Sequence, residues 1–398
     1  MKRVLWLLLL VVLCPLRGQA APLGQDAPIE IQGEASYTFG SQIAFRATLP
    51  PEIAAQSPQV FVFWQAQGQI ATNQAEMLPV TDGEYQHQAP LAAGAIRPFA
   101  EVRYWFRLRF PDGSSQESVP QTFRYADNRY QWQTLESAPF QVHWYEGDLD
   151  FGQALLDEAQ RALQASRNWL SLPPQDTIHI YAYASASEVQ SALQLSGYNW
   201  VAGHADPALN VILVALPPGI DQRYEIGRQI PHELMHILLY HKLGPDAAPL
   251  PAWLDEGLAS NAEHIVNPDY AWLLQDTYAR DALLPLSDLC AAFPRDAASA
   301  LLSYAEAQSF TAYLHAQYGR SGMEALLNAY ADGLACERAP QVALGKSLSQ
   351  LERAWIQTEL AHSIWATLRE MYPYLLLLGV IILVPLLALW RYPPPEGA

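Results

Sequence analysis

Cysteine and basic side chains are both scarce in this 398-residue sequence, and each scarcity narrows the classes of protein to consider. There are 3 cysteines and no Cys-x-x-Cys pair, so a zinc site built on cysteine thiolates is not expected. Lysine and arginine total 23 against 40 acidic residues, for a formal net charge of -17, and they form no basic patch. Nucleic acid is therefore not an expected partner. No internal repeat or low-complexity tract is apparent, which leaves an ordinary globular chain.

The strongest chemical signal is the stretch 232–236, which reads His-Glu-Leu-Met-His. Side chains four apart on a helix lie on one face, so His232 and His236 would present two imidazoles to one metal ion. Glu233 lies close enough to take a proton from a water that the metal binds. This pattern is typical of zinc hydrolases. Pro231 precedes the motif, so the helix either starts near Arg228 or kinks at the proline.

A third ligand is expected downstream, because a catalytic zinc takes three protein ligands and keeps one position open. The stretch 253–257 reads Trp-Leu-Asp-Glu-Gly, and it follows His236 at a distance that allows a second helix to return toward the metal. With these two motifs the sequence resembles the gluzincins, the thermolysin-like and aminopeptidase-like metallopeptidases. More narrowly, residues 139–360 resemble the peptidase-MA-like domains of bacterial surface proteins.

The resemblance implies one Zn²⁺ ion held by His232, His236 and Glu256, with Glu233 as the catalytic base. Glu263 lies on the same predicted helix as Glu256 but outside the motif, so replacing Glu256 by alanine is expected to lower zinc affinity sharply, whereas replacing Glu263 by alanine is not.

The resemblance also implies how a substrate would be held. The strand before the metal helix corresponds to the sheet edge at which gluzincins bind an extended peptide. The substrate-binding residues expected there are Val211, Ile212, Leu213 and Val214. Tyr304 resembles the tyrosine that donates a hydrogen bond to the developing oxyanion in aminopeptidase-like members, and it is the second catalytic candidate. The Gly-x-Met-Glu-Asn motif that anchors a free N-terminus in those members is absent upstream of the metal helix, which favours an endopeptidase.

The length favours two domains, and 51% apolar residues are enough for real cores. Alternating apolar and charged residues in 100–110, with turn signals around them, are typical of strands in an immunoglobulin-like or fibronectin-like sandwich. The predicted fold class is α+β, a thermolysin-like zinc peptidase domain preceded by that all-β sandwich and followed by a C-terminal transmembrane helix. The predicted parts are a signal peptide (1–21), the sandwich (22–126), a linker (127–138), the peptidase domain (139–370), the transmembrane helix (372–391) and a cytoplasmic tail (392–398).

The two ends of the chain carry the localisation signals. Lys2 and Arg3 precede an apolar run and then small residues, as in a secretory signal peptide. The apolar run near the C-terminus is about long enough to span a bilayer and is flanked by tyrosines, as in interfacial belts. These features predict a single-pass cell-membrane protein whose catalytic domain is extracellular. Two cysteines would remain after cleavage, Cys290 and Cys336, and the sequence allows either a disulfide or two buried thiols.

Two functions stay open at this point. The first is a membrane-anchored extracellular zinc metallopeptidase that hydrolyses peptide bonds of a peptide or protein substrate by Glu-assisted attack of water. The second is a non-catalytic cell-surface binding protein with a structural or idle metal site. The intact Glu233 favours the first, because a structural zinc ion needs no base.

Overall fold

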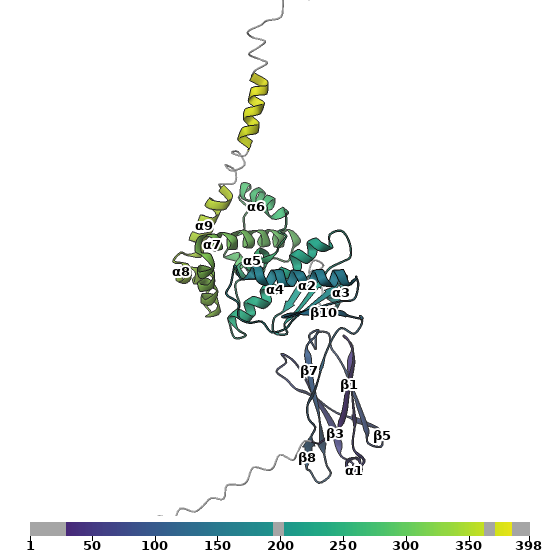
Figure 1. Cartoon of the computed structure of the whole chain (residues 1–398). Coiled ribbons are helices and arrows are strands. Elements are labelled where there is room, and N and C mark those ends of the chain that lie inside the picture. The colour runs from purple at the N-terminus through teal and green to yellow at the C-terminus, as the bar shows by residue number, and fades with distance from the viewer. Residues whose placement is uncertain (1–28, 194–202, 362–370, 384–398) are drawn as a thin grey trace, which may run out of the picture. The chain divides into compact units, whose positions relative to one another are not determined.

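The computed structural model describes residues 29–193, 203–361 and 371–383, in two compact units (Figure 1). The expected signal peptide, residues 1–21, lies outside the described residues. The first unit comprises Met1–Tyr37, Gln42–Pro90 and Glu101–Phe123, and the second comprises Thr38–Ser41, Leu91–Ala100 and Arg124–Ala398.

The first unit consists of two antiparallel sheets whose inner faces pack together. One sheet has the order β1 (Gln32–Thr38), β2 (Gln42–Thr48), β6 (Glu84–Pro90) and β5 (Leu78–Thr81), with the short helix α1 (Pro51–Ala54) between β2 and β3. The other has the order β4 (Asn73–Glu76), β3 (Gln59–Ala66), β7 (Glu101–Arg109) and β8 (Ser115–Glu117), with β9 (Gln121–Arg124) also paired to β7. Phe45 of β2 contacts Trp64 of β3 and Tyr104 of β7, with ring centroids 5.3 and 5.5 Å apart. The alternating run at 100–110 therefore forms a strand with one buried face, as predicted.

The second unit contains a five-stranded sheet with one face covered by helices. The order is β10 (Gln133–Ser137), β11 (Phe140–Trp144), β12 (Ile178–Tyr183), β14 (Val211–Ala215) and β13 (Gly203–Asp206). The three inner strands are parallel and both outer strands are antiparallel to their neighbours. Helices α2 (Leu149–Ser166) and α4 (Gln222–Leu243) share a core with the sheet, in which Trp144 fills the space that a side chain at Gly152 would need. This packing fixes α4, the metal helix, against the sheet.

This strand order corrects the predicted substrate-binding strand. Residues 211–214 lie on β14, which is hydrogen-bonded to β12 on one side and to β13 on the other, and every residue of β14 is buried. An interior strand has no free backbone groups for a peptide. The strand that forms this edge of the sheet, among the described residues, is β13.

Helix α3 packs against strands β12 and β14 of the sheet. The helices from α5 onward pack around a second core that contains Trp253, Phe310 and Trp355. In chain order the helical elements are α3 (Ala186–Leu193), α5 (Ala252–Ala262), α6 (Asp269–Ala279), a 3-10 turn (Asp288–Cys290), α7 (Ala297–Ala331), α8 (Ala339–Leu344), α9 (Leu348–Trp355) and a π-helical turn (Ile356–Leu360). Gly319, at φ 62°, interrupts α7, so this element is two helices joined at a glycine.

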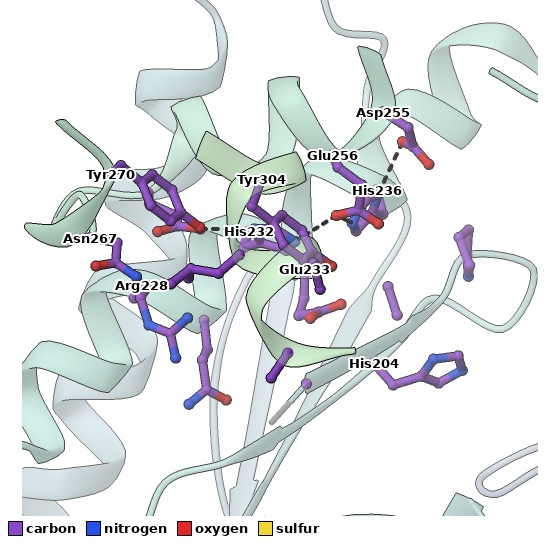
Figure 2. A pocket seen from close by; sticks show the side chains of 18 residues that line it. His204, Arg228, His232, Glu233, His236, Asp255, Glu256, Asn267, Tyr270 and Tyr304 are labelled. Carbon is purple, nitrogen blue, oxygen red and sulfur yellow. Dashed lines mark hydrogen bonds and ion pairs between the residues drawn. The ribbon is translucent and has the colours of Figure 1, made fainter. Parts of the chain in front are cut away.

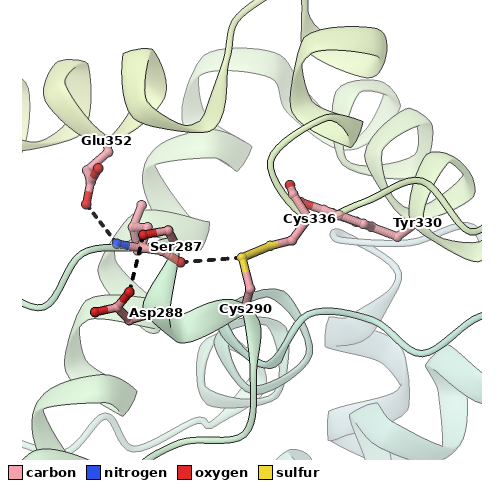
Figure 3. Close-up of a disulfide and its surroundings, with 7 residues drawn as sticks. Ser287, Asp288, Cys290, Tyr330, Cys336 and Glu352 are labelled. Atoms are coloured by element: carbon pink, nitrogen blue, oxygen red, sulfur yellow. Dashed lines mark hydrogen bonds between the residues drawn. A yellow bond between two sulfur atoms is a disulfide. The ribbon is translucent and has the colours of Figure 1, made fainter.

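Cys290 and Cys336 form a disulfide, so of the two alternatives that the sequence left open the structure contains the bond (Figure 3). Their Cα atoms are 6.0 Å apart and the chain separation is 46 residues. The Tyr330 hydroxyl donates to the carbonyl of Cys336, 2.8 Å away. One cysteine precedes α7 and the other follows it, so the bond links the chain on either side of its two helices, the first of which carries Tyr304.

The predicted transmembrane helix over 372–391 is wrong, and the predicted fold class is corrected in that part. Among residues 29–193, 203–361 and 371–383, no helix is long and apolar enough to cross a membrane. The rest of the predicted span, 384–391, lies outside the described residues. The predicted single-pass location in the cell membrane, and the membrane as a partner, are corrected with it.

Candidate metal centre

The helix that carries the His-Glu-Leu-Met-His motif continues through a proline. Helix α4 begins at Gln222 and Pro231 lies inside it, so of the two alternatives that the sequence left open the start near Arg228 is excluded. A proline has no N–H to donate to the carbonyl four residues earlier, which here belongs to Gly227. That carbonyl instead accepts the backbone N–H of His264, 2.9 Å away. The carbonyl that the proline leaves without a helical donor is therefore hydrogen-bonded by the backbone just after α5.

Two histidines of α4 and one glutamate of α5 converge on a common point (Figure 2). Nε2 of His232 lies 3.3 Å from Oε2 of Glu256, and Nε2 of His236 lies 3.8 Å from the same oxygen. One ligand atom from each residue falls within 4.8 Å of the others. Oε2 of Glu256 is buried and has no hydrogen-bond partner among the described residues. The sequence-predicted ligands are therefore brought together, with a buried oxygen aimed between the two imidazoles.

Each imidazole is held on its other nitrogen by a second carboxylate. Nδ1 of His232 donates to Oε1 of Glu263 at 2.9 Å, and Nδ1 of His236 donates to Oδ1 of Asp255 at 3.0 Å. In the neutral imidazoles these bonds leave the two Nε2 atoms with the lone pairs that can bind a metal ion. Sequence reasoning missed both carboxylates. Asp255 is adjacent to Glu256 in the motif, whereas nothing local marks Glu263.

Glu233 lies against the edge strand of the sheet. A Cβ built at Gly203 of β13 would lie 2.4 Å from Oε1 of Glu233, which is closer than real side chains approach. The glycine therefore gives the Glu233 carboxylate its place between the metal helix and the strand. Neither Gly203 nor β13 was predicted from the sequence.

Tyr304 reaches the same cavity from α7. Its ring lies 6.3 Å from that of His232 and 5.1 Å, edge to face, from that of Phe293. Burial, followed by the nearby carboxylates of Glu256 and Glu233, raises the pKa of its hydroxyl far above the usual value. The hydroxyl therefore keeps its proton at neutral pH and is available as a donor.

These groups line one cavity of about 680 Å³. Its walls also include side chains that the sequence did not single out, among them Arg228, Asn267 and Tyr270. The cavity meets the sheet at Gly203, His204 and Ala205 of β13, and residues 211–214 are not among its walls. The catalytic candidates therefore face the edge strand and not the strand predicted from the sequence.

A model of the peptidase MA superfamily matches residues 158–361, just over half of the chain. This chain belongs to the peptidase MA superfamily. The matched region contains both histidines, Glu233, Glu256 and Tyr304, so the assignment covers the whole cavity centre of this peptidase MA protein. No curated protein matches its sequence.

Solved structures similar to this peptidase MA protein include the M1 zinc metallopeptidase from Deinococcus radiodurans. That match has 13% identity and a TM-score of 0.36, covering 79% of this chain and 88% of the other. An alanine mutant of the same enzyme matches with 11% identity and a TM-score of 0.35, over 79% and 89% of the two chains. A purple acid phosphatase from yellow lupin seeds matches with 12% identity and a TM-score of 0.20, over 48% and 35%. At such TM-scores these likenesses add nothing to the assignment, which the family match carries.

The electrostatics of the metal-free site are dominated by its carboxylates. Burial lowers the pKa of both imidazoles, but the neighbouring carboxylates outweigh it. Glu256 and Glu263 raise the pKa of His232 well above its usual value, and Asp255 and Glu256 raise the pKa of His236 to about 9. Without a metal, both imidazoles are therefore doubly protonated and positively charged at neutral pH.

This predicts a steep pH dependence of metal binding. A metal ion binds neutral imidazole, so binding must release the protons of His232 and His236. The apparent zinc affinity should rise by up to about tenfold per pH unit for each proton released. Because the pKa of His236 is about 9, the rise should continue through pH 8, whereas a histidine of ordinary pKa would level off near pH 6.5. Chelator-competition titrations from about pH 6 to about pH 9 measure it.

The stability of the metal-free protein should fall over the same pH range in which its zinc affinity rises. The contacts between the protonated imidazoles and the neighbouring carboxylates stabilise the fold fully below about pH 6.5. This stabilisation is lost as the pH rises toward 9 and the imidazoles lose their protons. Melting temperatures of the metal-free protein should therefore fall across this window. A zinc affinity that is flat above pH 7 would contradict the assignment of these two imidazoles.

Proposed function

We propose that this peptidase MA protein is a zinc-dependent metallopeptidase that cleaves internal peptide bonds of unfolded or extended substrates. The observation that carries the proposal is the convergence of Nε2 of His232, Nε2 of His236 and the buried Oε2 of Glu256, with Glu233 beside them. Two nitrogens and one carboxylate oxygen match the ligand set of catalytic zinc sites. The endopeptidase assignment is supported by the edge strand, because β13 reads Gly-His-Ala-Asp and lacks the glutamate that anchors a free N-terminus in the aminopeptidase-like gluzincins.

The residues present fit one zinc ion. Each Nδ1 is hydrogen-bonded to a carboxylate, so the neutral imidazoles, which are the form that a metal ion binds, would direct the Nε2 lone pairs toward Glu256. When bound, zinc supplies a Lewis acid that polarises the scissile carbonyl and lowers the pKa of a water molecule in its open position.

The other steps belong to side chains of this chain. The outer edge of β13, unpaired among the described residues, would hold the substrate backbone as an added strand. Glu233 would take the proton of the attacking water and deliver it to the leaving nitrogen. Tyr304 would donate a hydrogen bond to the oxygen on which negative charge develops.

The proposal is tested with the purified full-length chain. Metal analysis should find about one zinc ion per chain, and the protein should cleave unfolded casein. Removal of the metal with a chelator should abolish cleavage, and added zinc should restore it. Bound zinc without any cleavage would instead support the alternative, a binding protein with an idle metal site.

Replacing Tyr304 with phenylalanine tests the oxyanion role. The substitution keeps the ring and removes only the donor, and a positioned donor is worth roughly 10²-fold or more in turnover. We expect kcat to fall by about that factor with little change in KM, zinc content or melting temperature, since the bond forms only in the transition state. Tyr313→Phe and Tyr318→Phe, on the same helix but outside the cavity, are the controls. Equal activity of all three variants would make Tyr304 a packing residue only.

A further inference from the structure

Arg228 places a guanidinium in the catalytic cavity. It lies four residues before His232 on α4, so the two side chains leave the same face of the helix. Its side chain is 30% exposed. In Figure 2, Arg228 lies with Asn267 and Tyr270 on one side of His232, away from His236 and Asp255. The cavity thus has a cationic corner beside an otherwise carboxylate-rich centre.

One edge of this guanidinium is held in place by a hydrogen bond. Nη2 of Arg228 donates to Oε2 of Glu225 at 2.8 Å. The same oxygen accepts a hydrogen bond from Nε2 of Gln229 at 2.8 Å. That amide nitrogen also donates to the carbonyl of Ala215 at 3.0 Å. Glu225 is therefore tied to the sheet through Gln229, and it holds the arginine in a defined orientation.

The rest of the guanidinium has no partner in the described part of the chain. A guanidinium offers five N–H donors, and one of them is used. Two further donors stand nearby. Asn267 uses its Oδ1 to accept the N–H of Asp269 at 3.0 Å, which leaves its amide N–H groups, and the Tyr270 hydroxyl likewise has no hydrogen bond to another described residue. The corner therefore offers several hydrogen-bond donors to an acceptor on a bound molecule.

We propose that Arg228, Asn267 and Tyr270 bind a carboxylate of the substrate, so that cleavage is fastest where an acidic group lies at a fixed position from the scissile bond. A planar carboxylate matches the unpaired edge of a guanidinium and accepts two parallel hydrogen bonds from it. The carboxylate can come from an aspartate or glutamate side chain or from the free C-terminus of a short peptide. This inference rests on the proposed peptidase function.

The charges around Arg228 determine how strongly a carboxylate should be preferred over a neutral group. Glu225 and Glu263 both act electrostatically on Arg228, so the local field is not strongly positive. Recognition then depends on direct hydrogen bonds, and those to a charged acceptor exceed those to a neutral one by about tenfold in binding. We expect kcat/KM for a carboxylate to exceed that for its amide isostere by about this factor.

The experiment compares matched peptides with the zinc-loaded full-length protein. One arm pairs peptides that differ by glutamate or glutamine at each position around the cleaved bond. The other arm pairs a free C-terminal acid with a C-terminal amide. The readout is the kcat/KM ratio within each pair, for the native protein, Arg228→Gln, Arg228→Lys and the control Arg223→Gln. Arg223 lies on the same helix outside this cavity.

A preference of about tenfold in one arm identifies the source of the carboxylate. The ratio should fall to about one in Arg228→Gln, take an intermediate value in Arg228→Lys, which keeps the charge without the planar fork, and stay unchanged in Arg223→Gln. Because each value is a ratio within one variant, it does not depend on how much of that variant is folded. Cleavage without preference in either arm, or a preference that survives in Arg228→Gln, overturns this inference alone. Failure to cleave any peptide overturns the proposed function and this inference with it.

Discussion

Replacing Glu233 with glutamine is expected to lower kcat by about 10²–10⁴-fold while the protein still binds zinc. Glutamine keeps the shape of the side chain and its fit against Gly203, but it cannot take the proton of the attacking water. The metal ligands His232, His236 and Glu256 are untouched. The measurement is kcat on an unfolded protein substrate, together with zinc content by elemental analysis and the melting temperature.

The control removes a carboxylate elsewhere. Glu337 is exposed and lies outside the cavity, so Glu337→Gln should leave turnover as it is in the native protein. Substantial activity in Glu233→Gln would show that another group takes the proton, and the role assigned to Glu233 would fall.

The second large effect concerns zinc affinity, for which we expect a graded loss. Glu256→Ala removes a ligand atom and should weaken zinc binding by on the order of 10³-fold. Glu263→Gln should weaken it by about 10–100-fold, because Glu263 accepts the Nδ1–H of His232 and fixes which nitrogen is free. From the sequence alone, no sharp loss of zinc affinity is expected on replacing Glu263.

Zinc competition titrations at a single pH above 7 separate the two classes. Glu337→Gln should bind zinc as the native protein does. If Glu256→Ala retained native affinity, the ligand set would have to be reassigned. If Glu263→Gln did so, its hydrogen bond to His232 would have no part in holding the metal.

The part of this site that the sequence predicts is the part made by local geometry. Two histidines four residues apart share a helix face wherever the helix is, and Glu256 stands in a recognisable block. Glu263 could not be found this way. Its position depends on where α5 ends, at Ala262, and on the chain crossing back to α4, which is a long-range contact.

The sheet shows the same division. The strand at 211–215 is apolar throughout and was recognised as a strand, but its place in the sheet was not. The true edge, β13, consists of Gly203, His204, Ala205 and Asp206, which have little preference for strands. Its pairing with β14 overrides that preference. The glycine that weakens the strand signal is the residue that makes room for Glu233.

Pro231 has a consequence for the order in which the site assembles. A proline inside a helix costs about 3 kcal/mol, so the segment that carries both histidines is a poor helix by itself. The N–H of His264 compensates at Gly227, and it arrives only when the end of α5 docks. The same docking brings Glu263 to His232. The hydrogen bond to the Gly227 carbonyl and the hydrogen bond that orients His232 therefore form together, as parts of one cooperative folding unit. Undocking of α5 would therefore remove both the backbone hydrogen bond at Gly227 and the hydrogen bond that orients His232.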